Sequence, residues 1–138
     1  MDYRDEIIDH YKNPRNFGEM EGADVTINEA NASCGDVVQV QVKMGMDPRI
    51  PPRRTGREDD KVGGKIIEEV KWRGVGCAIS TAAASMLSEK VVGMDKRDLE
   101  KLGETGIIKM LGGEINPGRM KCAMLAYRGL LKVFENND

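Results

Sequence analysis

IIEEVKWRGVGCAISTAAASMLSEKV, residues 66–91, decides the fold, because its hydrophobic period changes near the middle. Residues 66–73 alternate imperfectly between two faces, as in a strand, and one face carries Ile66, Glu68, Val70 and Trp72. After Cys77 the apolar residues recur at helical spacing, in a stripe of Ile79, Ala82, Ala83, Met86, Leu87 and Val91. The stretch therefore predicts a strand, a glycine-rich turn and a helix that ends at Gly93.

The sequence before this stretch predicts one helix and two further strands. Residues 2–12 carry apolar side chains at helical spacing, and Asn13-Pro14 ends that helix. Residues 37–44 alternate valine or methionine with glutamine or lysine, which indicates a half-buried strand. A shorter strand is expected over residues 23–28.

The sequence after this stretch predicts only helices. Short helices are expected over residues 95–102 and 104–111, before Gly112-Gly113. A last helix begins near Met120 or Lys121, and its core-facing residues are Met120, Ala123, Met124, Tyr127, Leu130, Leu131 and Phe134. Strands followed by helices, without strand–helix–strand alternation, predict an α+β fold. We expect a small antiparallel sheet of about three strands, covered by helices, in a single domain over residues 1–138.

Residues 45–64 separate two of the predicted strands and are rich in proline, glycine and charge. This composition predicts a long hairpin loop. Its mixed charge could dock a partner, but a solvated loop is the interpretation we favour.

Composition excludes several classes of protein. With 40% hydrophobic and 32% charged residues, the chain of 138 residues is globular rather than disordered. Its 21 basic and 23 acidic residues give a net charge of −2, which does not favour nucleic acid. No apolar run has the length of a membrane span. The acidic N-terminus lacks an apolar signal core, and the three cysteines are an odd number, so we expect a reducing, cytoplasmic location.

Cys34, Cys77 and Cys122 are too far apart in the sequence to form a local zinc finger or a CxxC redox motif. If they act together, the fold must gather them from three loops. Cys34 and Asp36 are two residues apart, so in an extended segment their side chains point the same way. Cys77 and Cys122 precede or open predicted helices, whose positive ends favour the thiolate form.

Arg119 and Lys121 add positive charge beside Cys122. Three thiolates and one carboxylate would repel one another unless a cation or cluster lay among them. Three cysteines and one aspartate suit tetrahedral zinc, and also a [2Fe-2S] cluster with one labile oxygen ligand. Three inert, buried thiols are the alternative. A cysteine hydrolase is disfavoured because the only histidine, His10, is expected to be a surface or capping residue of the first helix.

Four segments resemble the U-type iron–sulfur cluster assembly scaffold family, which comprises IscU, SufU and the N-terminal domain of NifU. They are DHYKNPRN at residues 9–16, CGD at 34–36, GCAIS at 76–80 and KCA at 121–123. The resemblance covers almost the whole chain and implies a three-stranded antiparallel sheet with packed helices. It also implies that Cys34, Asp36, Cys77 and Cys122 bind the metal or cluster, with Asp36 assisting cluster release.

The chain departs from the IscU pattern at two places. Lys121 stands where IscU members have a histidine, and a protonated amine is a poor metal ligand. Residues 116–119, NPGR, replace the chaperone-binding LPPVK motif of bacterial IscU. The segment from Arg119 to Cys122 resembles SufU instead, but the spacing between Cys77 and Cys122 is the shorter one of IscU.

The resemblance leads to one hypothesis and two alternatives. The leading hypothesis is a non-enzymatic scaffold that accepts sulfur from a cysteine desulfurase, with Cys122 as the sulfur acceptor. It would assemble a [2Fe-2S] cluster and transfer it to apo iron–sulfur acceptor proteins, as a monomer or a homo-oligomer. The first alternative is a SufU-type, zinc-dependent sulfur acceptor that stimulates a desulfurase. The second is a zinc-stabilised binding module without sulfur chemistry.

Overall fold

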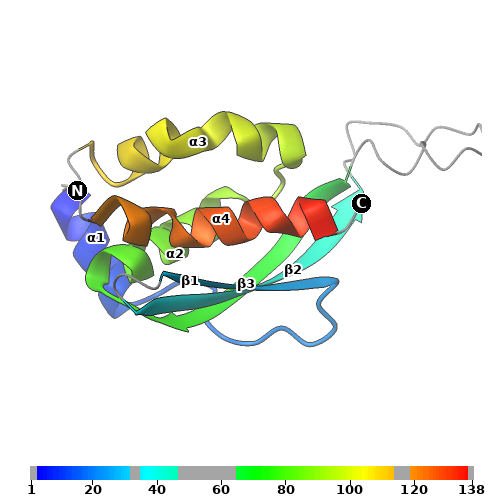
Figure 1. Cartoon of the computed structure of the whole chain (residues 1–138), viewed down its shortest axis with the longest axis horizontal. Coiled ribbons are helices and arrows are strands. Elements are labelled where there is room, and N and C mark those ends of the chain that lie inside the picture. The colour runs from blue at the N-terminus through cyan, green and yellow to red at the C-terminus, as the bar shows by residue number, and fades with distance from the viewer. Residues whose placement is uncertain (1–2, 32–34, 47–64, 114–118, 137–138) are drawn as a thin grey trace, which may run out of the picture.

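A computed structural model describes residues 3–31, 35–46, 65–113 and 119–136 of the chain. The elements follow the order α1 (Tyr3–Lys12), β1 (Val25–Asn31), β2 (Asp36–Met46), β3 (Lys65–Val75), α2 (Ala78–Lys90), α3 (Lys96–Met110) and α4 (Met120–Asn136). The strands form one antiparallel sheet in the order β1-β2-β3. Figure 1 shows α4 lying over this sheet, with α3 on the outer side of α4. The predicted α+β, single-domain fold is confirmed.

The sheet follows the alternation predicted for residues 37–44, with Val38, Val40 and Val42 buried against the helices. For β3 the predicted face is wrong in its first half, because Ile67 is fully buried and Ile66 is not. Lys43 pairs with Glu69, but Met44 pairs with Ile67, so a β-bulge at Glu68 shifts the register. One extra residue moves the following side chains to the opposite face.

The two strands beside the predicted loop of residues 45–64 have slightly different ends from those expected. β2 continues to Met46, and β3 begins at Lys65. Residues 47–64 lie outside the described part of the chain. β1 begins and ends later than the strand predicted for residues 23–28.

Residues 13–24 connect α1 to β1 and bind to the free edge of β3. The backbone N–H of Trp72 donates to the carbonyl of Asn16 at 3.0 Å, and that of Gly18 donates to the carbonyl of Trp72 at 2.8 Å. The indole N–H of Trp72 donates to the carbonyl of Arg15 at 2.8 Å. Phe17 packs edge-on against the Trp72 ring. These contacts fix the end of β3 that leads into Gly76 and Cys77.

His10 is neither a surface residue nor a capping residue. It lies between α1 and α2, its side chain is only 12% exposed, and its Nδ1 is 2.7 Å from Ser85 Oγ. The backbone N–H of Arg15 also donates to Ser85 Oγ, at 2.8 Å. His10 was expected at the surface or at a helix end because histidine is more often found there than as a metal ligand. Its second ring nitrogen, Nε2, lies 3.7 Å from Glu89 Oε1, so both ring nitrogens have a polar neighbour.

The helices agree with the predicted positions. The two helices expected over residues 95–102 and 104–111 are confirmed, because α3 consists of two helical segments that meet at a kink at Gly103, whose backbone φ is 57°. Tyr127 of α4 bridges the break, since its hydroxyl donates to the carbonyl of Leu99 at 2.7 Å and accepts from the N–H of Gly103 at 3.0 Å. Among the described residues, no helix has the length and apolar character needed to cross a membrane.

Candidate metal centre

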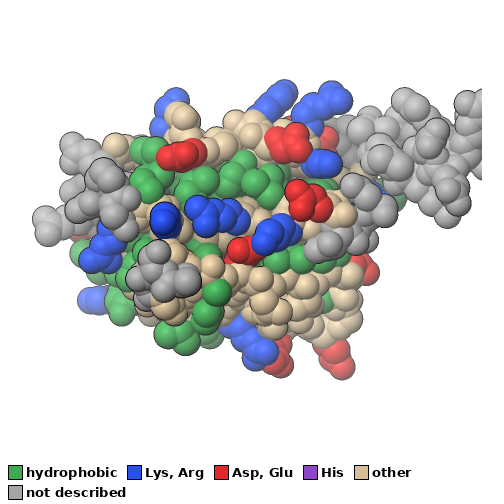
Figure 2. Space-filling view, viewed as in Figure 1, with side chains coloured by type: hydrophobic (Ala, Val, Ile, Leu, Met, Phe, Trp, Pro, Cys, Tyr) green, Lys and Arg blue, Asp and Glu red, His purple; other side chains and the backbone are tan. Residues whose placement is uncertain are grey.

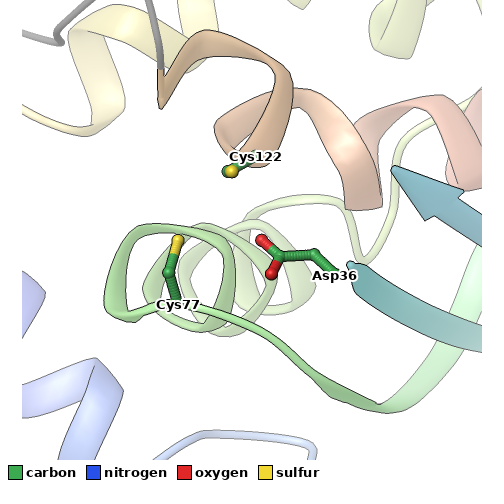
Figure 3. A group of neighbouring side chains, drawn as sticks. All are labelled: Asp36, Cys77 and Cys122. Carbon is green, nitrogen blue, oxygen red and sulfur yellow. The ribbon is translucent and has the colours of Figure 1, made fainter. Parts of the chain in front are cut away.

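Three elements bring a carboxylate and two thiols together at one end of the sheet. Asp36 begins β2, Cys77 directly precedes α2, and Cys122 lies in the first turn of α4. One ligand atom from each of these residues lies within 4.8 Å of the other two. Figure 3 shows the three side chains converging on the space between the two helices and the strand. Cys34 lies outside the described residues.

Asp36 reaches this position because of the turn that precedes it. Gly35 has a φ of +75°, which glycine adopts without strain, and its N–H donates to the carbonyl of Asn31 at 2.8 Å. Asp36 then pairs with Asn31 across the two strands. Because side chains alternate along a strand, Asp36 shares the helix-facing side with Val38 and is only 5% exposed.

Cys77 is the N-cap residue of α2, with an extended backbone (φ −76°, ψ 173°). Its Sγ accepts a hydrogen bond from the backbone N–H of Ser80 at 3.5 Å. Burial raises the pKa of the Cys77 thiol, but hydrogen bonds from the backbone N–H groups of Ser80 and Ile79, together with the neighbouring Ser80 and Cys122 side chains, outweigh it. The net result is a lowered pKa, which favours a thiolate at the start of the helix.

Cys122 is 4% exposed, whereas Arg119 and Lys121 are exposed. Consecutive residues of a helix point about 100° apart, so the helix that directs Cys122 inward directs Lys121 toward solvent. Figure 2 shows basic side chains next to acidic ones over α3 and α4, so basic charge is not gathered into one patch on that face. The structure brings Cys122 to the site but leaves both basic side chains at its surface.

A buried carboxylate, a buried thiol and the half-buried thiol of Cys77 form a costly arrangement when all three are ionised. A cation among them would offset both their mutual repulsion and their lost hydration. Sulfur and carboxylate oxygen are ligands of tetrahedral zinc, and thiolates hold iron–sulfur clusters. The three donors therefore fit either a zinc ion or an iron–sulfur cluster. In both cases a fourth ligand completes the coordination.

Ser80 and Gly76 belong to the surroundings of this site, and the sequence analysis included both in the GCAIS motif without assigning either a role. Ser80 is 8% exposed, and its hydroxyl donates to the carbonyl of Cys77 at 3.0 Å. A Cβ atom on Gly76 would lie 2.1 Å from Ser80 Oγ and 3.1 Å from Asp36 Cγ. A serine three residues after a cysteine at a helix start was the available signal.

The fold and the site define a class: small α+β domains that gather thiols and a carboxylate between one sheet end and two helix starts. The chain belongs to the family of NifU-like N-terminal domains, whose profile matches residues 2–51 and 59–136. The predicted U-type family is thereby confirmed.

Several curated relatives are similar over nearly the whole chain. The zinc-dependent sulfurtransferase SufU of Bacillus subtilis is 30% identical over 94% of this chain and 87% of its own length. The iron–sulfur cluster assembly scaffold protein IscU 1 of Archaeoglobus fulgidus is 29% identical over 98% of this chain and 78% of its own. The bifunctional protein NifU/MnmA of Rubrobacter xylanophilus is 32% identical over 97% of this chain, which spans only 24% of that relative.

A solved structure supports the fold. The crystal structure of an iron–sulfur cluster assembly scaffold protein for the SUF system from Fervidobacterium islandicum superposes with a TM-score of 0.71. It covers 94% of this chain and 93% of its own at 24% identity, a level that supports the common fold alone.

Proposed function

We propose that this chain is an iron–sulfur cluster assembly scaffold that builds a [2Fe-2S] cluster on Cys34, Asp36, Cys77 and Cys122. The observation that carries the proposal is the convergence of the Asp36, Cys77 and Cys122 ligand atoms within 4.8 Å. Relatives named as cluster assembly scaffolds support it. Iron and sulfide are the cargo of such a protein, so the site must both hold the cluster and release it.

Sulfur arrives in this proposal from the persulfide of a cysteine desulfurase. The Cys122 thiolate attacks the outer sulfur, a new S–S bond forms at Cys122, and the bond within the desulfurase persulfide breaks. The desulfurase cysteine leaves as a thiolate, so the transfer itself is balanced without a reductant. Conversion of the persulfide sulfur to the sulfide of a cluster then takes two electrons per sulfur atom, which an external thiol or other reductant supplies. Because Cys122 is 4% exposed, the first turn of α4 must open to admit the donor sulfur.

The ligand roles follow from the chemistry of each donor. Cys34 and Cys77 supply thiolates that hold iron, and Cys77 is already favoured in that form by its helix-capping position. Asp36 supplies a weaker oxygen ligand, which keeps one corner of the cluster exchangeable. Arg119 and Lys121 support the ionised form of Cys122 from the surface. Apo iron–sulfur proteins are the acceptors of the finished cluster.

A zinc-dependent sulfur acceptor is the second candidate, and two observations favour it. Lys121 cannot serve as the ligand that a histidine would provide, and the SufU relative is called a zinc-dependent sulfurtransferase. A resident zinc would hold the thiols of Cys34, Cys77 and Cys122 in the thiolate form, together with Asp36. The protein would then pass sulfur on without building a cluster.

One experiment separates these functions. The chain is incubated without oxygen with ferrous iron, cysteine, a thiol reductant and a catalytic amount of desulfurase, and its visible absorption is recorded. Sulfide-to-iron charge-transfer bands that vanish in Cys34→Ser, Cys77→Ser and Cys122→Ser support the scaffold. A colourless protein with one bound zinc and a stimulated desulfurase supports the sulfur acceptor. A desulfurase that ignores the protein contradicts both.

A further inference from the structure

Ser80 lies in the first turn of α2, directly behind the Cys77 ligand. Its backbone N–H points at Cys77 Sγ, 3.5 Å away, and its hydroxyl donates to the Cys77 carbonyl at 3.0 Å. That carbonyl also accepts the N–H of Thr81 at 3.0 Å. Cys77 is thus held at its sulfur and at its carbonyl by one serine, and the serine is 8% exposed.

The space occupied by the Ser80 hydroxyl exists because residue 76 is glycine. A Cβ atom there would lie 2.1 Å from Ser80 Oγ, which is a severe overlap, and 3.3 Å from Asp36 Oδ2. The serine hydroxyl and the Asp36 carboxylate therefore border the same point above Gly76. Gly76 is not one of the described glycines that have a positive φ. The close approach of Ser80 and Asp36, and not backbone strain, therefore explains why residue 76 is glycine.

Groups directly behind metal ligands orient those ligands, and their loss commonly weakens metal binding by about 10- to 100-fold. Ser80 has the required placement, since it touches one ligand residue and neighbours a second. A role in ligand orientation would account for a buried polar group at this place.

We propose that Ser80 is a positioning residue of this centre. Its hydroxyl, seated above Gly76, fixes the Cys77 main chain beside the Asp36 carboxylate and so sets the relative placement of the two ligand atoms. The inference rests on the proposed function of the site as a metal or cluster centre, and adds a residue that does not itself bind the metal.

Ser88 provides a matched control on the same helix. Ser88 is 2% exposed, and its hydroxyl donates to the carbonyl three residues earlier, that of Ser85, at 2.7 Å, as Ser80 does to Cys77. Ser88 Oγ also accepts from the Asn16 side-chain amide at 3.0 Å and lies 3.3 Å from the Arg15 carbonyl, so Ser88→Ala removes a buried hydroxyl with more partners than that of Ser80. Ser88→Ala is therefore a strict control for lost stability, because only Ser80 borders the ligands.

The test measures zinc affinity by competition with a chromophoric chelator, and the cobalt-substituted spectrum of each variant. We expect Ser80→Ala to weaken zinc binding by about tenfold and to shift the cobalt bands, with Ser88→Ala within about twofold of the wild type. Equal effects of the two substitutions, or no effect of Ser80→Ala, would overturn the proposal.

If Ser80→Ala does not fold, Ser80→Thr and Ser80→Val replace it, because threonine and valine side chains have the same shape and differ in the hydroxyl. The Ser80→Thr protein must then bind zinc at least about fivefold more tightly than the Ser80→Val protein.

Gly76→Ala separates positioning from general stability. Its added Cβ collides first with Ser80 Oγ, so Ser80→Ala should restore much of the thermal stability that Gly76→Ala loses. Zinc affinity should stay low in the double variant, because the positioning hydroxyl is gone. Recovery of wild-type affinity would contradict the proposal. A wild-type protein that binds neither zinc nor a cluster would instead refute the proposed function itself.

Discussion

His10 of α1 and Ser85 of α2 share a partly buried hydrogen bond of 2.7 Å between Nδ1 and Oγ, which joins the two helices. Ser85 Oγ also accepts the N–H of Arg15. Burial lowers the pKa of His10 below its ordinary value of 6.5, and the Arg15 charge acts in the same direction. The carboxylates of Glu89, Asp9 and Glu6 oppose this shift only in part.

We therefore predict that the protein loses stability as the pH falls below 6.5. The unfolded chain binds a proton at its only histidine at a higher pH than the folded chain does, so acidification favours unfolding. The loss grows until the pH passes the lowered pKa of the folded state and then levels off. Urea denaturation at a series of pH values measures it.

His10→Gln is the control for this pH dependence. The glutamine can still bond to Ser85, but it does not titrate, so the slope of stability between neutral and mildly acidic pH should be much smaller. An unchanged slope in His10→Gln would assign the effect to carboxylates and contradict the prediction.

A second prediction concerns Tyr127, whose hydroxyl satisfies two backbone groups at the break in α3. Tyr127→Phe leaves the carbonyl of Leu99 and the N–H of Gly103 without this partner. We expect a loss of about 1–3 kcal/mol in the free energy of unfolding, the usual cost of unsatisfied buried groups. Urea denaturation measures it, and Tyr11→Phe is the control, because Tyr11 is 48% exposed. Losses of equal size in both variants would show that the bridge contributes nothing.

Particular residues show how far the sequence predicted this structure. Strand β2 was predictable because apolar residues alternate over residues 37–44, and helix α2 because apolar residues recur at helical spacing after Cys77. The burial of Ser80, Ser85 and Ser88 in α2 lies outside that stripe and was not predictable from it. The buried face of β3 was not predictable either, since the bulge at Glu68 depends on how β2 pairs with it and leaves only an irregular alternation in the sequence.

The candidate site shows the same division. Cys77, Cys122 and Asp36 were suggested by their chemistry and by the motifs around them, and the structure brings all three together. Ser80 was assigned no role because serine is common at helix starts, and its significance depends on the missing side chain of Gly76 in three dimensions. His10 was misplaced because its partner, Ser85, is 75 residues away in the sequence.

A third prediction concerns the route of sulfur. Cys122→Ser should abolish formation of a persulfide on this protein when desulfurase and cysteine are supplied, because a serine hydroxyl is not a nucleophile toward sulfur at neutral pH. Mass spectrometry of the intact protein, followed by peptide mapping, detects the added sulfur atom. Cys77→Ser is the matched comparison and should retain labelling at Cys122. Undiminished labelling of Cys122→Ser at Cys77 or Cys34 would refute the assignment of Cys122 as first acceptor.

The fourth prediction concerns cluster release and follows from the chemistry of Asp36. Its carboxylate is buried among thiols and is the weakest ligand of the proposed set, so exchange with an acceptor ligand should begin there. Asp36→Ala should keep the charge-transfer spectrum of the loaded protein but slow transfer to an apo-ferredoxin by at least about tenfold. The rate is followed by the circular dichroism of the acceptor's cluster. Asp5→Ala, which removes an exposed carboxylate of α1, should transfer at the wild-type rate. Equally fast transfer from Asp36→Ala would show that the cluster leaves by one of the thiolate corners, and that the buried carboxylate serves another purpose.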